Sequence, residues 1–139
     1  MTVLIIDGQG GRLGKYLCEQ ISEKCPNVIL EAVGTNTAAT AAMIKGGAKK
    51  AATGDNSIAV LAKTADVIIG PIGMVIADSL LGEITPKAAV SIARSSAVKI
   101  MIPSDKCGNT VAGVKDIPLS EMADDAVRRL TEIMRQNES

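Results

Sequence analysis

Short apolar runs alternate along this sequence with longer segments whose apolar residues recur at helical spacing. Such runs are typical of strands buried on both faces of a parallel sheet. They occupy residues 3–6, 28–33, 67–69 and 98–102, with a weaker run at 48–53. The helical segments cover about residues 11–24, 37–45, 56–64, 73–81, 86–95 and 119–136.

This alternation predicts a doubly wound α/β fold. Right-handed crossovers place helices on both faces of an open parallel sheet, which gives three layers. The expected sheet has five strands in the order 3-2-1-4-5, and residues 110–114 carry the pattern of a small additional edge strand. A chain of 139 residues has the length of one ordinary domain, so we expect residues 1–139 to fold as a single unit.

A turn rich in glycine follows the first strand. Gly8, Gly10 and Gly14 form a GxGxxxG pattern, one residue longer than the dinucleotide-binding fingerprint, and Gly11 adds a fourth glycine. Glycines let the backbone approach a phosphate, while the next helix directs its free N–H groups at the charge. The pattern predicts an anion site, and the alternative is a tight turn that only lets strand and helix pack closely. The candidate binding residues are Gly8, Gln9, Gly10, Gly11, Arg12, Leu13 and Gly14.

Two better-known motifs do not fit this turn. A Walker A motif would need glycine at Gln9 and a serine or threonine at Tyr16. A short-chain dehydrogenase would need lysine four residues after its catalytic tyrosine, but Gln20 follows Tyr16 at that distance. The sequence therefore argues against both of these classes.

The end of the second strand predicts the ribose side of the site. An acid there usually accepts hydrogen bonds from the adenosine ribose of NAD. This chain has Gly34, Thr35 and Asn36 instead. Neutral donors at Thr35 and Asn36, with Arg12 in the glycine turn, favour NADP over NAD. Thr35 and Asn36 are equally good candidates for the N-cap of the next helix.

A second glycine-containing turn follows the fourth strand. Gly70, Pro71 and Gly73 are predicted to face the first turn across the point where strand order reverses, which is where doubly wound sheets bind ligands. We expect these three residues to form the opposite wall of the ligand crevice. The alternative is a rigid turn that only docks a helix.

Asp7 and Cys107 are the candidates for catalytic roles. Asp7 lies directly before the glycine turn, where it could bind loop N–H groups or act as a metal ligand or catalytic group. Lys106 could lower the thiol pKa of Cys107, although a loop cysteine without a histidine is more often passive. The sequence contains no histidine, which removes the commonest metal ligand and general base, and no metal site is predicted.

Composition restricts the partners and the compartment. Fifteen basic and fifteen acidic residues cancel to a formal charge of +0, and Tyr16 is the only aromatic residue, so nucleic acid is not an expected partner. No apolar stretch reaches the ~18 residues that a bilayer requires, so no membrane association is expected. Three cysteines without a CxxC pair fit a reducing compartment, and we expect a cytoplasmic protein. The helix predicted over 73–81 has apolar residues on more than the one face that packs on the sheet. A homo-oligomer, most simply a homodimer, would bury this additional apolar surface.

Four segments together resemble a known family: IIDGQGGRLGK, GTNTAATAAMIKGGA, ATGDNSI and DVIIGPIGMVIADSLLGEITP. They are similar to a family of short bacterial proteins catalogued only as a domain of unknown function, and the resemblance covers nearly the whole chain. It implies a small Rossmann-like protein and assigns no activity. More distantly, the first turn resembles NAD(P)-binding Rossmann proteins.

Two functions remain open at the level of sequence. The first is a Rossmann-like protein that binds a nucleotide or another phosphorylated ligand, with NADP or NAD as the expected cofactor. The second is a non-enzymatic sensor or accessory subunit that binds a small anionic metabolite at the same turns. A lyase or transferase that uses Cys107 and Asp7 is a third hypothesis. The residue pattern leaves open whether the protein is an enzyme.

Overall fold

The computed structural model describes residues 1–104 and 108–138. The strands are β1 (Thr2–Asp7), β2 (Ile29–Gly34), β3 (Lys50–Thr53), β4 (Val67–Pro71) and β5 (Val98–Ile102). The helices are α1 (Arg12–Lys24), α2 (Thr37–Lys45), α3 (Asp55–Ala62), α4 (Pro86–Arg94) and α5 (Leu119–Glu138), with a short 3₁₀ helix, η1 (Ile72–Val75).

The five strands form one parallel sheet in the order β3-β2-β1-β4-β5, as predicted. The strand order reverses between β1 and β4, which places the switch point beside the turn that follows β1. Asp7 is paired with Gly34, so β1 and β2 end level with each other. The turns after these two strands are therefore neighbours at the carboxyl edge of the sheet.

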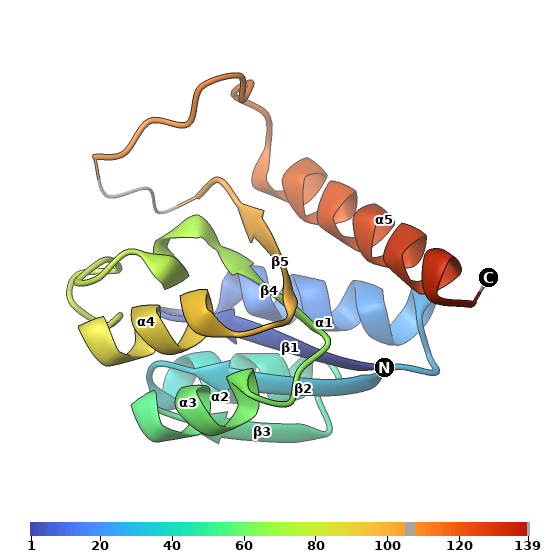
Figure 1. Ribbon diagram of the computed structural model, residues 1–139, viewed down its shortest axis with the longest axis horizontal. Helices are drawn as coiled ribbons and strands as arrows, with labels where there is room; N and C mark the ends of the chain where they lie inside the picture. Colours follow the sequence, from blue (N-terminus) through green and yellow to red (C-terminus); the bar gives the residue numbers. More distant parts are fainter. Residues whose placement is uncertain (105–107, 139) are drawn as a thin grey trace.

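Two apolar layers hold the helices on the sheet. Successive residues of β1 point to opposite faces, with Val3 and Ile5 in one core cluster and Leu4 and Ile6 in the other. The first cluster includes residues of α1, α2 and α5, and the second includes residues of α3 and α4. Figure 1 shows α3 and α4 in front of the sheet and α1 and α2 behind it. The structure confirms the predicted three-layer, Rossmann-like α/β fold.

Local capping explains where two helices begin. Asn36 accepts a hydrogen bond from the Ala39 N–H at the start of α2, over 2.9 Å. Thr85 accepts from the Ala88 N–H at the start of α4, and Pro86 occupies the first helical position. Asn36 therefore has the capping role that the sequence left open.

The predicted helix over residues 73–81 is wrong. Only η1 forms, and a compact loop follows it at residues 76–85. The buried Ser79 hydroxyl donates to the Gly73 carbonyl, and the Asp78 N–H donates to the Ile84 carbonyl, so the chain turns back instead of continuing as a helix. Positive φ angles occur in this loop at Asp78, Leu80, Leu81 and Gly82.

The homodimer prediction rested on that apolar helix. Met74 and Leu80 are buried within the chain, whereas Leu81 is 94% exposed. The apolar surface left for self-association is therefore smaller than predicted, and the oligomeric state stays a prediction.

The additional edge strand at residues 110–114 is also not formed. Gly108 and Gly113 have positive φ angles, which interrupt an extended backbone, and residues 108–118 are mostly exposed. Figure 1 shows this segment arching away from the sheet before α5 begins. Within the described residues, β5 is thus the last strand on its side of the sheet.

Candidate functional site

Asp7 fixes the shape of the glycine turn, residues 8–14. Its Oδ1 accepts from the Gly8 N–H over 2.8 Å and its Oδ2 from the Gly14 N–H over 2.7 Å. The side chain is buried. One carboxylate therefore joins the end of β1 to the first turn of α1. This is the local hydrogen-bonding role that the sequence suggested for Asp7, and no finding tests a catalytic or metal-binding role.

Close packing accounts for three of the four glycines. A Cβ at Gly11 would lie 2.7 Å from the Ala39 Cα, and Gly11 also has a φ of +73°. A Cβ at Gly14 would lie 2.6 Å from the Met43 Sδ, and one at Gly8 would lie 2.7 Å from the Thr35 Oγ1. At Gly10 a Cβ would meet nothing within 4 Å. Gly10 is the one glycine of the turn for which packing gives no reason.

The first turn of α1 presents backbone donors beside this glycine. The Gly11 N–H donates to the Gly8 carbonyl over 2.9 Å and closes the turn. The N–H groups of Arg12 and Leu13 have no acceptor among the described residues, as expected for the first turn of a helix. Together with the helix dipole, such groups attract an anion.

Glu83 is the site residue that the sequence did not reveal. It comes from the loop at residues 76–85, and its Oε1 accepts three hydrogen bonds at the ends of β1 and β2. The donors are the Gln9 N–H at 2.9 Å, the Thr35 hydroxyl at 2.6 Å and the Asn36 Nδ2 at 2.8 Å. No residue pattern signals this contact, because it depends on how the loop folds back over the sheet edge.

The Glu83 carboxylate is held in its charged form. Partial burial acts to raise the pKa of Glu83, but hydrogen bonds from Thr35, the Gln9 N–H and Asn36 outweigh that effect and lower it below its ordinary value. The carboxylate is therefore ionised at neutral pH. A negative charge thus lies at the turn that was predicted to receive an anion.

This finding corrects the prediction of a neutral ribose side. The sequence of β2 ends without an acid, but the structure places the Glu83 carboxylate against Thr35 and Asn36. Asn36 uses both ends of its amide, with Oδ1 capping α2 and Nδ2 donating to Glu83 and to the Gln9 carbonyl. The preference for NADP, which rested on neutral donors, loses its basis.

The turn at Gly70, Pro71 and Gly73 has a packing role. A Cβ at Gly70 would lie 2.7 Å from the Ile6 carbonyl oxygen, and the Gly73 carbonyl accepts from Ser79. The Leu80 side chain lies 3.4 Å from the position that a Cβ of Gly8 would take. Leu80 and Glu83 therefore lie against the glycine turn, and the predicted ligand role of Gly70, Pro71 and Gly73 stays a prediction.

Two hollows lie near α5. One of about 430 Å³ is lined by Arg12, Leu13 and Tyr16 of α1 and by Leu119, Ser120 and Ala123. It borders the first turn of α1, where the N–H groups of Arg12 and Leu13 have no acceptor in the described part of the chain. The Tyr16 hydroxyl donates to Asp124 over 2.7 Å, which joins α1 to α5 next to this hollow.

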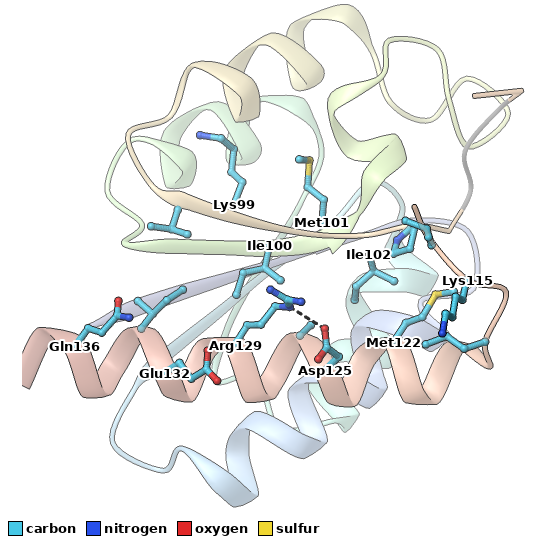
Figure 2. A pocket seen from close by; sticks show the side chains of 16 residues that line it. Lys99, Ile100, Met101, Ile102, Lys115, Met122, Asp125, Arg129, Glu132 and Gln136 are labelled. Carbon is cyan, nitrogen blue, oxygen red and sulfur yellow. Dashed lines mark hydrogen bonds and ion pairs between the residues drawn. The ribbon is translucent and has the colours of Figure 1, made fainter. Parts of the chain in front are cut away.

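The other hollow is a groove of about 710 Å³ between β5 and α5. Figure 2 shows Ile100 and Ile102 pointing toward α5, while Lys99 and Met101 point to the other side of the sheet. Arg129 reaches into the groove and is paired with Asp125 over 2.8 Å. The groove is mainly apolar and lies away from the glycine turn.

The cysteines of the described chain are buried. Burial raises the thiol pKa of Cys18 to about 12 and also raises that of Cys25, so neither is a nucleophile at neutral pH. Cys107, the candidate catalytic thiol, lies outside the described residues.

Comparison with known families gives one match. The family described as a domain of unknown function, DUF3842, matches residues 2–135. The chain belongs to this family. No curated protein and no solved structure matches the DUF3842 chain. In the described part of the chain, no helix is long and apolar enough to cross a membrane.

The DUF3842 site contains two features that attract groups of opposite charge. The backbone donors of Arg12 and Leu13 attract an anion, while the Glu83 carboxylate attracts donors or a cation. Both lie at the carboxyl edge of the sheet next to the switch point. Such a pair suits a ligand that carries a phosphate at one end and hydroxyl groups at the other.

Proposed function

We propose that this DUF3842 protein binds a nucleotide of the NAD(P) type, with its phosphates at the glycine turn. The observation that carries the proposal is the pairing of two features at the carboxyl edge of the sheet: the N–H groups of Arg12 and Leu13, which have no acceptor among the described residues, and the Glu83 carboxylate, which is fixed at the ends of β1 and β2. Doubly wound sheets bind nucleotides at the switch point, with the pyrophosphate at the N-terminus of the first helix and a carboxylate near the ribose. The hollow beside Arg12 and Leu13 offers room for the phosphates.

Gly10 allows a test that separates ligand binding from folding. A Cβ at Gly10 would meet nothing within 4 Å, so Gly10→Asp should leave the fold intact while placing a negative charge beside the phosphate position. Thr64→Asp is the matched control, because it adds the same charge at an exposed position just before β4, at the opposite edge of the sheet.

The measurement is thermal unfolding and calorimetric titration with ADP, NAD, NADP and inorganic pyrophosphate. A ligand at 100 times its Kd should stabilise the wild-type chain and the Thr64→Asp variant by about 2.7 kcal/mol. The Gly10→Asp variant should lose this stabilisation and keep its unfolding temperature without ligand. The proposal fails if no nucleotide stabilises the wild type, or if Gly10→Asp binds as well as the control.

A second candidate is a non-enzymatic sensor or accessory subunit that binds a small anionic metabolite at the same turn. It is favoured because the carboxyl groups at the turn, those of Asp7 and Glu83, are both engaged in hydrogen bonds with the chain itself. Binding without turnover, together with a ligand-dependent change of mass in light scattering, would support this candidate. Consumption of a bound cofactor with any substrate would contradict it.

Two further expectations belong to the proposal. We propose a homo-oligomeric protein in a reducing compartment, most simply the bacterial cytoplasm, since Cys18 and Cys25 are unpaired thiols. The mass of the purified chain in solution tests the first point, and the location of a tagged chain in its host cell tests the second.

A further inference from the structure

The Glu83 carboxylate is anchored through only one of its oxygens. Three donors converge on Oε1, whereas Oε2 accepts from no described residue. The Glu83 side chain is half-buried. Only Glu31 Oε1 and Ser104 Oγ are fully buried polar side-chain atoms without a partner in the described chain, so Oε2 of Glu83 is in contact with solvent. Oε2 is therefore a charged acceptor that is fixed in place and accessible from outside.

The place of this acceptor has a known use in doubly wound sheets. An acid at the end of the second strand usually accepts hydrogen bonds from the hydroxyls of the adenosine ribose, while the phosphates lie at the start of the first helix. In this chain Thr35 and Asn36 follow β2, and both donate to Glu83. No acidic residue follows β2 in this chain. Glu83, from the loop after β4, supplies a carboxylate at that place instead.

The loop holds Glu83 in this place by its own hydrogen bonds. The Glu83 N–H donates to the Leu80 carbonyl over 3.1 Å, and the Asp78 N–H donates to the Ile84 carbonyl over 2.7 Å. Leu80 and Ile84 are buried on either side of it. The carboxylate is therefore positioned before any ligand arrives.

We propose that Glu83 recognises the ribose of the bound nucleotide, its Oε2 accepting from the free 2′,3′-diol, and that it excludes nucleotides that carry a 2′-phosphate. This inference rests on the proposed function and names its ligand class, a nucleotide of the NAD type rather than the NADP type. A 2′-phosphate would bring about 1.5 to 2 negative charges against an ionised carboxylate. A free hydroxyl instead offers a donor to that charge, the stronger kind of hydrogen bond.

The test compares ligands that differ only at the 2′ position. Calorimetric titration at fixed salt uses ADP against 2′-deoxy-ADP and NAD against NADP. The variants are the wild type, Glu83→Gln, and Glu132→Gln in α5 as the control, since the Glu132 side chain is 50% exposed and lies in the groove away from the glycine turn. Glutamine keeps an oxygen that can accept from Gln9 and Thr35 but removes the negative charge.

The wild type and the Glu132→Gln control should bind ADP and NAD about tenfold more tightly than 2′-deoxy-ADP and NADP, respectively. Glu83→Gln should bring both affinity ratios toward one, chiefly because it binds ADP more weakly and NADP more tightly than the wild type does. Its affinity for inorganic pyrophosphate should stay unchanged, because that probe has no ribose.

The outcomes separate the two proposals. If the wild type binds nucleotides but prefers NADP, or if Glu83→Gln leaves both ratios as they were, the role of Glu83 is overturned and the nucleotide site stands. If no nucleotide binds the wild type, the proposed function fails and this inference fails with it. If Glu83→Gln does not fold, the test is the ratio of the wild-type affinities for ADP and 2′-deoxy-ADP. A ratio of one overturns the inference.

Discussion

The hydroxyl of Thr35 donates to the Oε1 of Glu83 over 2.6 Å and joins two residues that are 48 positions apart in the sequence. This contact ties the loop after β4 to the end of β2. A hydrogen bond to a charged acceptor contributes more to stability than one between neutral groups.

Replacing Thr35 by valine should therefore loosen this loop. We expect Thr35→Val to lower the free energy of unfolding by about 1 kcal/mol, since Glu83 keeps two other donors and is partly exposed to water. Urea denaturation measures the loss, and hydrogen exchange should show faster exchange at the Asp78 and Glu83 amides. Thr37→Val is the control, because Thr37 is exposed in the first turn of α2. Equal stability of the two variants would contradict the prediction.

The contribution of Glu83 to stability should depend on pH. Its pKa in the folded chain lies below its ordinary value of 4.5, because the hydrogen bonds from Thr35, Gln9 and Asn36 outweigh its partial burial. The folded state then binds fewer protons than the unfolded state near that pH. The stabilisation is complete above about pH 4.5 and declines as the pH falls through the folded value.

The check on this pH dependence is acid titration of stability for the wild type and Glu83→Gln. The wild type should lose its advantage over the variant as the pH is lowered from neutrality past 4.5. A difference that stays constant across this range would show that the charge of Glu83 does not act through these donors.

Substitution by alanine should destabilise the chain at Gly11 but not at Gly10. Gly11→Ala places a Cβ 2.7 Å from the Ala39 Cα at a φ of +73°, so it should cost about 2 kcal/mol or more of stability. Gly10→Ala meets nothing within 4 Å and should leave the unfolding temperature nearly unchanged. Calorimetric melting of the two variants tests this contrast, and similar melting temperatures would show that α2 can move away.

Cys18 should resist alkylation in the folded chain. It is fully buried, and burial raises its thiol pKa to about 12, so almost no thiolate exists at neutral pH. Iodoacetamide labelling followed by peptide mass spectrometry should find Cys18 unmodified in buffer and modified in concentrated urea. Rapid labelling in buffer would mean that α1 leaves the sheet easily.

Glu31 is a place where stability can be gained. The residue is 9% exposed, and its Oε1 has no hydrogen-bond partner among the described residues. Because an unsatisfied buried acceptor is costly, Glu31→Met should raise the free energy of unfolding by about 1 kcal/mol. Glu31→Gln keeps the shape and a polar atom at this place, so it should gain less. A lower melting temperature for Glu31→Met than for the wild type would refute this expectation.

The strands and most helices could be predicted because their signals are local. Residues 3–6 of β1 and 67–69 of β4 are unbroken apolar runs, and Thr85 before Pro86 marks the start of α4. Right-handed crossovers then reduce the possible strand orders to a few, and the predicted 3-2-1-4-5 is the order that forms. The glycine turn was also visible, although packing against α2 explains Gly11 and Gly14.

The contacts of Glu83 could not be predicted in this way. Residues 73–81 are apolar enough to suggest a helix, but hydrogen bonds from Ser79 and Asp78 turn the chain back. Leu80 is then buried, and Glu83 reaches Thr35. Such a contact depends on loop conformation and long-range distance, and neither leaves a periodic pattern in the sequence.

The two hydrogen bonds of Asp7 to Gly8 and Gly14 set the conformation of the glycine turn without a ligand. A receptor whose backbone is already in its bound arrangement loses little conformational entropy on association. Binding at this turn should therefore follow single-step kinetics, with an association rate governed by diffusion and orientation rather than by a slow rearrangement.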